Sequence, residues 1–254
     1  MLRPCSLPGC SGFCRRCERE HSLPLGPAYQ AGLALMAELE AERRIDLQLP
    51  EEEADSRFST SYLFGPARGK MFGVLVAAAS DGRKIILRAF SGQYNGAWEV
   101  PGWVGPIFDL DAFHRVHDGE ERKIKELGRQ IEEQMTGSLP RQELIALRKQ
   151  MSQRLMVNIH NLYRLKNVAG KKAGLQEIFP PGMGLPTGTG DCCGPKLLQY
   201  AARHDLVPLG MAEFYWGRTN SSGTRQHGRF YPSCRTKCYP ILGFMLCGLE
   251  ENTR

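Results

Sequence analysis

Two pairs of cysteines carry the strongest chemical signal in the sequence. Cys192 and Cys193 follow the loop Pro186–Asp191, and Cys234 and Cys238 lie further along the chain. Zinc prefers four thiolate, imidazole or carboxylate ligands in a tetrahedral arrangement, and these need only converge in space. We therefore expect Cys192, Cys193, Cys234 and Cys238 to bind zinc. The alternatives are buried, inert cysteines and a reactive thiol pair.

The spacing within each pair restricts how the ligands can be arranged. Cys234 and Cys238 would share one face of a helix, because residues four apart are neighbours on a helical surface. Cys192 and Cys193 cannot point the same way on a regular helix. One of them is therefore expected at the helix cap or outside the ligand set, and His227 is the substitute or neighbouring group.

A second group of cysteines lies in residues 1–22, where Cys5, Cys10, Cys14 and Cys17 are followed by His21. This spacing suits a small zinc knuckle or, alternatively, an iron–sulfur cluster. The competing interpretation is a leader whose thiols bind nothing. The start of the chain lacks the apolar core of a secretory signal, and no apolar run reaches membrane-spanning length. We expect a cytoplasmic protein without a membrane partner, in which cysteines serve as metal ligands or reactive thiols rather than disulfides.

The charge pattern allows a nucleic-acid partner. The net charge is +6, which is compatible with RNA binding but also with other functions. Gly188 and Gly190 precede a predicted helix start, so a weak phosphate site is one interpretation and a tight turn that positions the cysteines is the other. The side chains we expect to face RNA are Lys196, Arg225, His227, Arg229, Lys171 and Lys172.

The elements that must position these residues form a mixed α/β (α+β) fold, a small mixed sheet with packed helices. Periodicity predicts a helix over 28–44, a β-hairpin over 71–79 and 84–90, a helix over 193–202, a strand over 206–216 and a helical segment over 234–246. Residues 118–166 are predicted to be an inserted antiparallel helical hairpin, with Ser138 as an N-cap. The expected organisation is a cysteine-rich head at 1–22, a first half of the core at 23–117, the insertion at 118–166 and a second half of the core at 167–254.

Several runs of sequence resemble a known family. LRAFSGQYNGAWEVPGWVGPIFD (87–109), PTGTGDCCGPKLLQYA (186–201), GMAEFYWG (210–217) and HGRFYPSCRTKCYPILGFML (227–246) resemble the accessory region that precedes the catalytic domain of long RluA-type RNA pseudouridine synthases. The similarity spans roughly residues 60–247 and leaves out the cysteine-rich head. The catalytic motif of that family, His-Arg-Leu-Asp followed by Thr-Ser-Gly, is not found. Its nearest match is Arg44-Ile45-Asp46, and we do not assign a catalytic role to Asp46.

The order of the predicted elements is also similar to that of zinc-dependent nucleobase deaminases. These enzymes have a β-hairpin, a helix that carries a zinc ligand beside a glutamate, a strand, and a helix that opens with Pro-Cys-x-x-Cys. Here the second pair is spaced by three residues, Cys234-x3-Cys238, and no glutamate stands two residues after the first ligand. The similarity implies that Asp191 or Glu213 would have to act as the proton shuttle.

Three functions follow as expectations. The first is a zinc-binding protein of RNA modification that recognises tRNA or rRNA, alone or with a pseudouridine synthase partner. The second is a deaminase-like zinc hydrolase that acts on a nucleobase. The third is a thiol redox protein that uses Cys192 and Cys193, although adjacent cysteines form a strained disulfide.

Overall fold

The computed structural model describes residues 8–251, and its centre is a four-stranded antiparallel sheet. The strands follow the order β4-β3-β7-β8, with bounds β3 Lys70–Ala78, β4 Lys84–Phe90, β7 Val207–Trp216 and β8 Arg229–Tyr231. Strands β3 and β4 form the predicted hairpin around a turn with Gly82 in the left-handed region. The mixed α/β fold expected from the sequence is confirmed.

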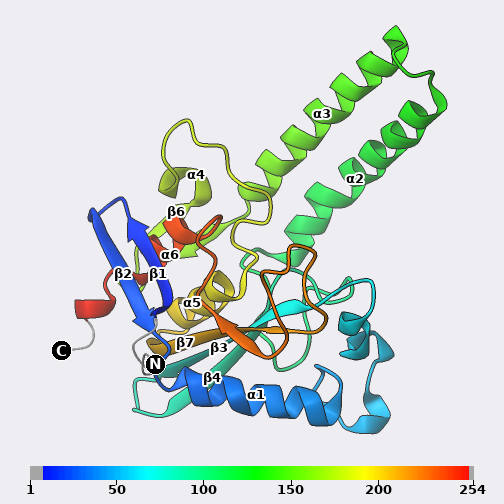
Figure 1. Cartoon of the computed structure of the whole chain (residues 1–254). Coiled ribbons are helices and arrows are strands. Elements are labelled where there is room, and N and C mark those ends of the chain that lie inside the picture. Colours follow the sequence, from blue (N-terminus) through cyan, green and yellow to red (C-terminus); the bar gives the residue numbers. More distant parts are fainter. Residues whose placement is uncertain (1–7, 252–254) are drawn as a thin grey trace.

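Side chains alternate along β3, so the sheet has two covered faces. Phe72 and Val74 pack in one cluster with Leu35 and Leu39 of helix α1 (Ala28–Glu42). Leu75 and Ala77 pack in another cluster with residues of helix α5 (Cys193–Arg203). Helix α1 and helix α5 therefore cover opposite faces of the sheet (Figure 1).

Helix α5 begins very close to the sheet because residue 73 has no side chain. A Cβ built on Gly73 would lie 2.5 Å from the Cβ of Cys193, nearer than two carbons can pack. Gly73 of β3 is the register partner of Glu213 of β7. The start of α5 therefore lies directly against the part of the sheet that carries Glu213.

The inserted helical hairpin is confirmed and projects away from the sheet (Figure 1). It consists of α2 (Leu110–Glu133) and α3 (Leu139–His160). Helix α2 begins before residue 118 because Asp109 caps it, with its side chain accepting a hydrogen bond of 2.7 Å from the Ala112 amide. Ser138 is the N-cap of α3, as predicted.

The described part of the cysteine-rich head is a β-hairpin packed against the last helix. Strands β1 (Pro8–Cys14) and β2 (Arg19–Pro24) pair antiparallel, and β1 lies on α6 (Tyr239–Leu246). The backbones almost touch, since a Cβ on Gly12 would lie 2.1 Å from the Gly243 nitrogen. The hairpin also shares the core of α5 and α6 through Cys10 and Leu23.

The remaining elements are short. They are β5 (Arg164–Lys166), β6 (Lys172–Gly174), α4 (Leu175–Ile178) and the 3-10 helices Glu51–Glu53, Ser56–Phe58, Ser61–Phe64 and Leu249–Glu251. Helix α6 begins at Tyr239, so Cys234 does not lie on a helix, and the expectation that 234–246 is a single helical segment was wrong at its start. Among the described residues, no helix has both the length and the apolar character needed to cross a bilayer.

Candidate metal centres

Three of the four cysteines predicted to share a metal do lie together. The sulfurs of Cys192, Cys234 and Cys238 are all within 4.8 Å of one another. Cys192 is the N-cap of α5 and Cys238 is the N-cap of α6, while Cys234 lies in the turn that precedes α6. We call these residues the three-cysteine group. Two helix N-termini meet at it, and their partial positive charge favours thiolates.

Hydrogen bonding among the three thiols favours ionisation of one of them. The pKa of Cys234 is held well below its usual range, first by the Cys192 thiol and then by the Cys238 thiol, both of which donate to its sulfur. Among the three thiols, Cys234 is therefore the one whose ionisation its neighbours favour. A thiolate with two further thiols beside it is the donor set that zinc prefers.

Cys193 does not belong to this group, so the predicted four-cysteine ligand set was wrong in one member. Its side chain is fully buried, and its thiol donates to the Met71 carbonyl over 3.4 Å. Cys192 precedes the first helical turn and Cys193 opens it, so the two side chains point in different directions. The sequence predicted that one of the two adjacent cysteines would lie at the helix cap or outside the ligand set. Cys192 lies at the cap, and Cys193 lies outside the ligand set.

Glu213 is a buried carboxylate that bridges the two segments carrying the cysteines. Only 3% of its surface is exposed. Its Oε1 accepts hydrogen bonds from the Gly194 amide (3.1 Å) and the Ser233 hydroxyl (2.7 Å). Burial raises the pKa of Glu213 to about 7, and the nearby Cys234 thiolate adds to the shift. The carboxyl can therefore gain or lose a proton close to neutral pH.

Asp191 lies beside the group but is engaged differently. The Tyr163 hydroxyl donates a hydrogen bond to Asp191 Oδ1, and burial raises the pKa of this carboxyl. Its carbonyl accepts a hydrogen bond of 2.7 Å from the Gly92 amide. Lys237 donates to the Thr187 carbonyl over 2.9 Å. These bonds fix the loop before α5, which agrees with a turn that positions Cys192.

Lys196 does not face solvent, contrary to its expected role in RNA contact. It is 1% exposed, and its ammonium donates to the carbonyls of Phe90 (3.0 Å) and Gly92 (2.8 Å). Burial lowers its pKa to about 8. The hydrogen bonds of its ammonium group thus connect the start of α5 to the end of β4.

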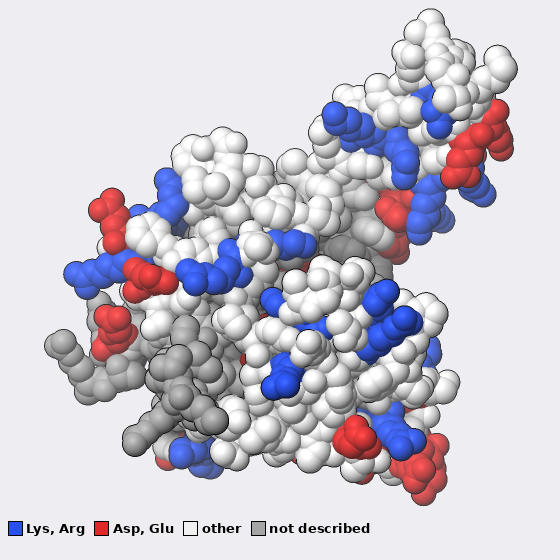
Figure 2. Space-filling view, in the orientation of Figure 1, with Lys and Arg blue, Asp and Glu red and all other residues white. Residues whose placement is uncertain are grey.

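The other residues expected to contact RNA lie at or near the surface. Arg229, His227, Lys171 and Lys172 are exposed, and the partly exposed Arg225 lies 4.3 Å over the ring of Tyr231. The Nδ1 of His227 accepts a hydrogen bond of 3.1 Å from the Gly217 amide, and His227 is not a member of the three-cysteine group. Figure 2 shows Lys and Arg side chains in separate groups on this face rather than in one continuous patch.

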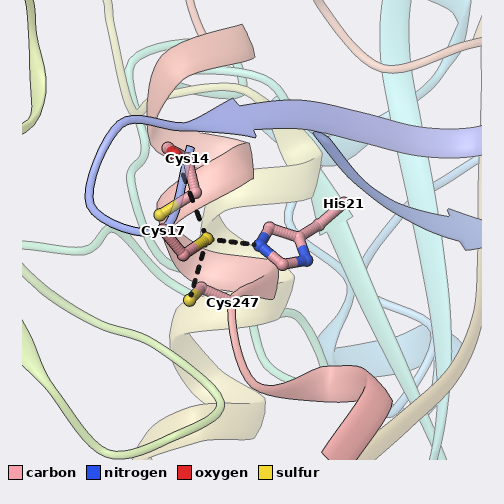
Figure 3. A group of neighbouring side chains, drawn as sticks. All are labelled: Cys14, Cys17, His21 and Cys247. Carbon is pink, nitrogen blue, oxygen red and sulfur yellow. Dashed lines mark hydrogen bonds between the residues drawn. The ribbon is translucent and has the colours of Figure 1, made fainter. Parts of the chain in front are cut away.

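A second set of side chains that could hold a metal ion joins the two ends of the described chain. It contains Cys14, Cys17, His21 and Cys247, whose ligand atoms lie within 4.8 Å of one another (Figure 3). The Cys17 sulfur is 3.0 Å from His21 Nε2 and 3.7 Å from the Cys247 sulfur. We call these residues the four-ligand group.

The surroundings of the four-ligand group suit a cation. Burial opposes ionisation of Cys14, but the backbone amides of Cys17 and Arg16 face its sulfur and lower its pKa on balance. Burial raises the pKa of Cys247 to about 12, and its thiol donates to the Cys17 sulfur. The Nε2 atom of His21 faces the sulfurs, and its other ring nitrogen, Nδ1, is buried and has no hydrogen-bond partner among residues 8–251.

The ligand set predicted for the head, Cys5, Cys10, Cys14 and Cys17, is therefore corrected at Cys10. Cys14 and Cys17 are members, but Cys10 is not, because it is fully buried beside Ser233 and Glu213. Cys5 lies outside the described residues. Cys247 was missed, since nothing in its local sequence links it to a group at the other end of the chain.

Comparison of the chain with protein-family models, with curated proteins and with solved structures found no significant match.

Proposed function

We propose that this protein is a zinc-dependent hydrolase of the nucleobase-deaminase type, and that its zinc is bound by Cys192, Cys234 and Cys238. One observation carries the proposal. Within residues 8–251, the three-cysteine group has no fourth Cys, His, Asp or Glu ligand, and three protein ligands with one open position are typical of catalytic rather than structural zinc. Zinc is the ion we propose for both the three-cysteine group and the four-ligand group, because thiolate and imidazole donors suit it best.

Zinc in the three-cysteine group would supply an activated water for attack on the base. In this proposal, Glu213 would accept a proton as water adds to the base and would return it to the leaving amine. Water adds at the carbon that bears the exocyclic amine, the carbon–nitrogen bond breaks, and ammonia leaves. A carboxyl with a pKa of about 7 is suited to both halves of this transfer. Asp191 is the weaker candidate because the Tyr163 hydroxyl already engages it.

The arrangement of strands and helices supports this class of chemistry. The hairpin β3–β4, helix α5, strand β7 and helix α6 occur along the chain in the order expected for nucleobase deaminases, with other elements inserted between them and cysteines at both helix N-termini. No glutamate stands two residues after Cys192, but Glu213 of the adjacent strand accepts a hydrogen bond from the amide of residue 194. Glu213 would therefore take the place of that glutamate. The carboxylate thus comes from the sheet rather than from the helix.

We propose RNA as the carrier of the base. Arg229 lies on β8 and Arg225 in the connection before it, and β8 pairs with β7 where Tyr231 faces Glu213 in register. Exposed cations on the strand next to the catalytic carboxylate would contact phosphates. The resemblance to the accessory region of RluA-type synthases supports RNA as well.

A second candidate is a module that recognises RNA with a purely structural zinc, alone or beside a pseudouridine synthase. The burial of Glu213, which is 3% exposed, favours this candidate, because a working proton shuttle must reach its substrate. The redox function is not proposed, since Cys193 is buried in the core, away from the three-cysteine group.

One experiment separates the two candidates. The purified protein and its Glu213→Gln variant are incubated with total cellular RNA, and nucleosides are then measured by mass spectrometry. A hydrolase should form uridine or inosine in the wild type only, while both proteins retain zinc. RNA binding without any base change, equal in both proteins, would reject the hydrolase and favour the recognition module. A Cys234→Ser variant should lose the zinc of the three-cysteine group together with any activity.

A further inference from the structure

We propose that the four-ligand group is a structural zinc site that holds the N-terminal hairpin against α6, and that it thereby keeps the buried side of Glu213 closed. All four positions around an ion would be filled by Cys14, Cys17, His21 and Cys247. A closed tetrahedral site of this kind has no position for water or substrate, so its contribution is to folding. The first half of the proposal is independent of the function proposed above, and the second half rests on it.

One separation between the ligand atoms agrees with a shared ion. Zinc–sulfur and zinc–nitrogen bonds of about 2.3 and 2.0 Å at tetrahedral angles place neighbouring ligand atoms about 3.5 to 3.8 Å apart. The Cys17 sulfur is 3.7 Å from that of Cys247, which is within this range. It is 3.0 Å from His21 Nε2, a hydrogen-bond distance, so these two atoms would move apart by about 0.5 Å when an ion binds. A disulfide between Cys17 and Cys247 would need about 2.05 Å, and both are free cysteines.

The four ligands come from two segments, the N-terminal hairpin and the end of α6, which an ion would join. Cys14 ends β1, Cys17 lies in the hairpin turn, His21 lies on β2, and Cys247 is the C-cap of α6. A two-stranded hairpin is marginally stable by itself. The contact between β1 and α6 combines a close approach of backbones at Gly12 and Gly243 with the buried side chains of Cys10 and Leu23. An ion held by both segments would add to the stability of this contact.

The hairpin also reaches the carboxylate through one serine. The Gly9 carbonyl of β1 accepts hydrogen bonds from the Ser233 amide (3.0 Å) and the Ser233 hydroxyl (3.1 Å). The same hydroxyl is 2.7 Å from Glu213 Oε1. Displacement of β1 would therefore remove the carbonyl that accepts both hydrogen bonds of Ser233, and it would admit water to Glu213.

The test combines metal counting with hydrogen exchange on the full chain. The wild type should bind two zinc ions per chain, and Cys17→Ser and Cys247→Ser should each bind one. Cys193→Ala is the matched control, since it removes a buried cysteine that belongs to neither group and should keep both ions. In the two serine variants, the Ser233 amide should exchange at least tenfold faster than in the wild type, while amides within α5 keep their rates. A Cys17→His variant, which replaces one zinc ligand by another, should restore the second ion and the slow exchange.

The outcomes that would overturn the inference are distinct from those that bear on the three-cysteine group. Unchanged zinc content in Cys17→Ser and Cys247→Ser would reject the site, and loss of the ion with unchanged Ser233 exchange would reject its role in holding β1. Loss of zinc in Cys234→Ser alone would support only the three-cysteine group. If the serine variants do not fold, cobalt titration of the unmodified chain decides. Two equivalents with thiolate charge-transfer absorption support the site, and saturation at one equivalent refutes it.

Discussion

Replacement of Glu213 by glutamine should stabilise the protein above neutral pH and leave its stability unchanged in acid. Glutamine reproduces the protonated carboxyl. Its side-chain oxygen can accept the two hydrogen bonds that the Gly194 amide and the Ser233 hydroxyl donate to Oε1 of Glu213. The variant therefore behaves as a glutamic acid that never ionises.

The magnitude follows from the shift in pKa. The carboxyl has an ordinary pKa of 4.5 and a folded pKa of about 7, because burial disfavours the charge. Between these values the folded chain holds a proton that the unfolded chain has lost, so the unfolding free energy falls as pH rises through this window. One pKa unit corresponds to about 1.4 kcal/mol, which gives a loss of about 3 kcal/mol in the wild type by pH 8.

The assay is urea denaturation of both proteins at several values between pH 4.5 and 8.5. The difference between the two unfolding free energies isolates Glu213, since every other titrating group is shared. This difference should rise from near zero to about 3 kcal/mol in favour of the variant. A flat difference, or a wild type that becomes the more stable protein as pH rises, would show that the ionised carboxylate is better stabilised than its burial implies.

Two further predictions concern the position of α5. Gly73→Ala places a Cβ 2.5 Å from that of Cys193, so we expect the unfolding free energy to fall by about 1–3 kcal/mol. We also expect the three-cysteine group to bind zinc more weakly. An unaltered zinc affinity would show that α5 can shift without moving Cys192. Lys196 has a folded pKa of about 8 against an ordinary 10.5, so the wild-type unfolding free energy should rise between these pH values, because there the unfolded chain binds the extra proton. The Lys196→Met variant should lack this rise. The same dependence of the unfolding free energy on pH in both proteins would show that burial does not lower the pKa of Lys196.

Local sequence patterns were sufficient to predict most of the fold. The apolar run of β3, the turn at Gly82 and the helical periodicity within residues 118–166 act over a few residues, so they can be recognised without the tertiary structure. Helix α6 was predicted to begin too early. Cys234 and Cys238 are four apart as helix neighbours would be, but they lie in a turn that ends at the N-cap.

The candidate sites were predicted only in part, because their members are distant in sequence. Cys17 and Cys247 are 230 positions apart, and spacing alone pointed to Cys5 and Cys10 as the nearer partners of Cys17. The Cys14-x2-Cys17-x3-His21 pattern was the available signal for His21. Lys196 was misplaced because nearly the whole surface of α5 is covered. A helix buried on all sides gives its lysine no solvent face, and this cannot be deduced from the sequence of the helix alone.

The wide separation of Cys17 and Cys247 also bears on how the chain is made. During synthesis the hairpin ligands leave the ribosome long before residue 247 does, so the newly made hairpin presents Cys14, Cys17 and His21 to an ion before Cys247 exists. Complete coordination becomes available when α6 has emerged and docked. Metal loading at this position would then wait until residue 247 has been made, and a product truncated before Cys247 would leave the thiols of Cys14 and Cys17 open to oxidation.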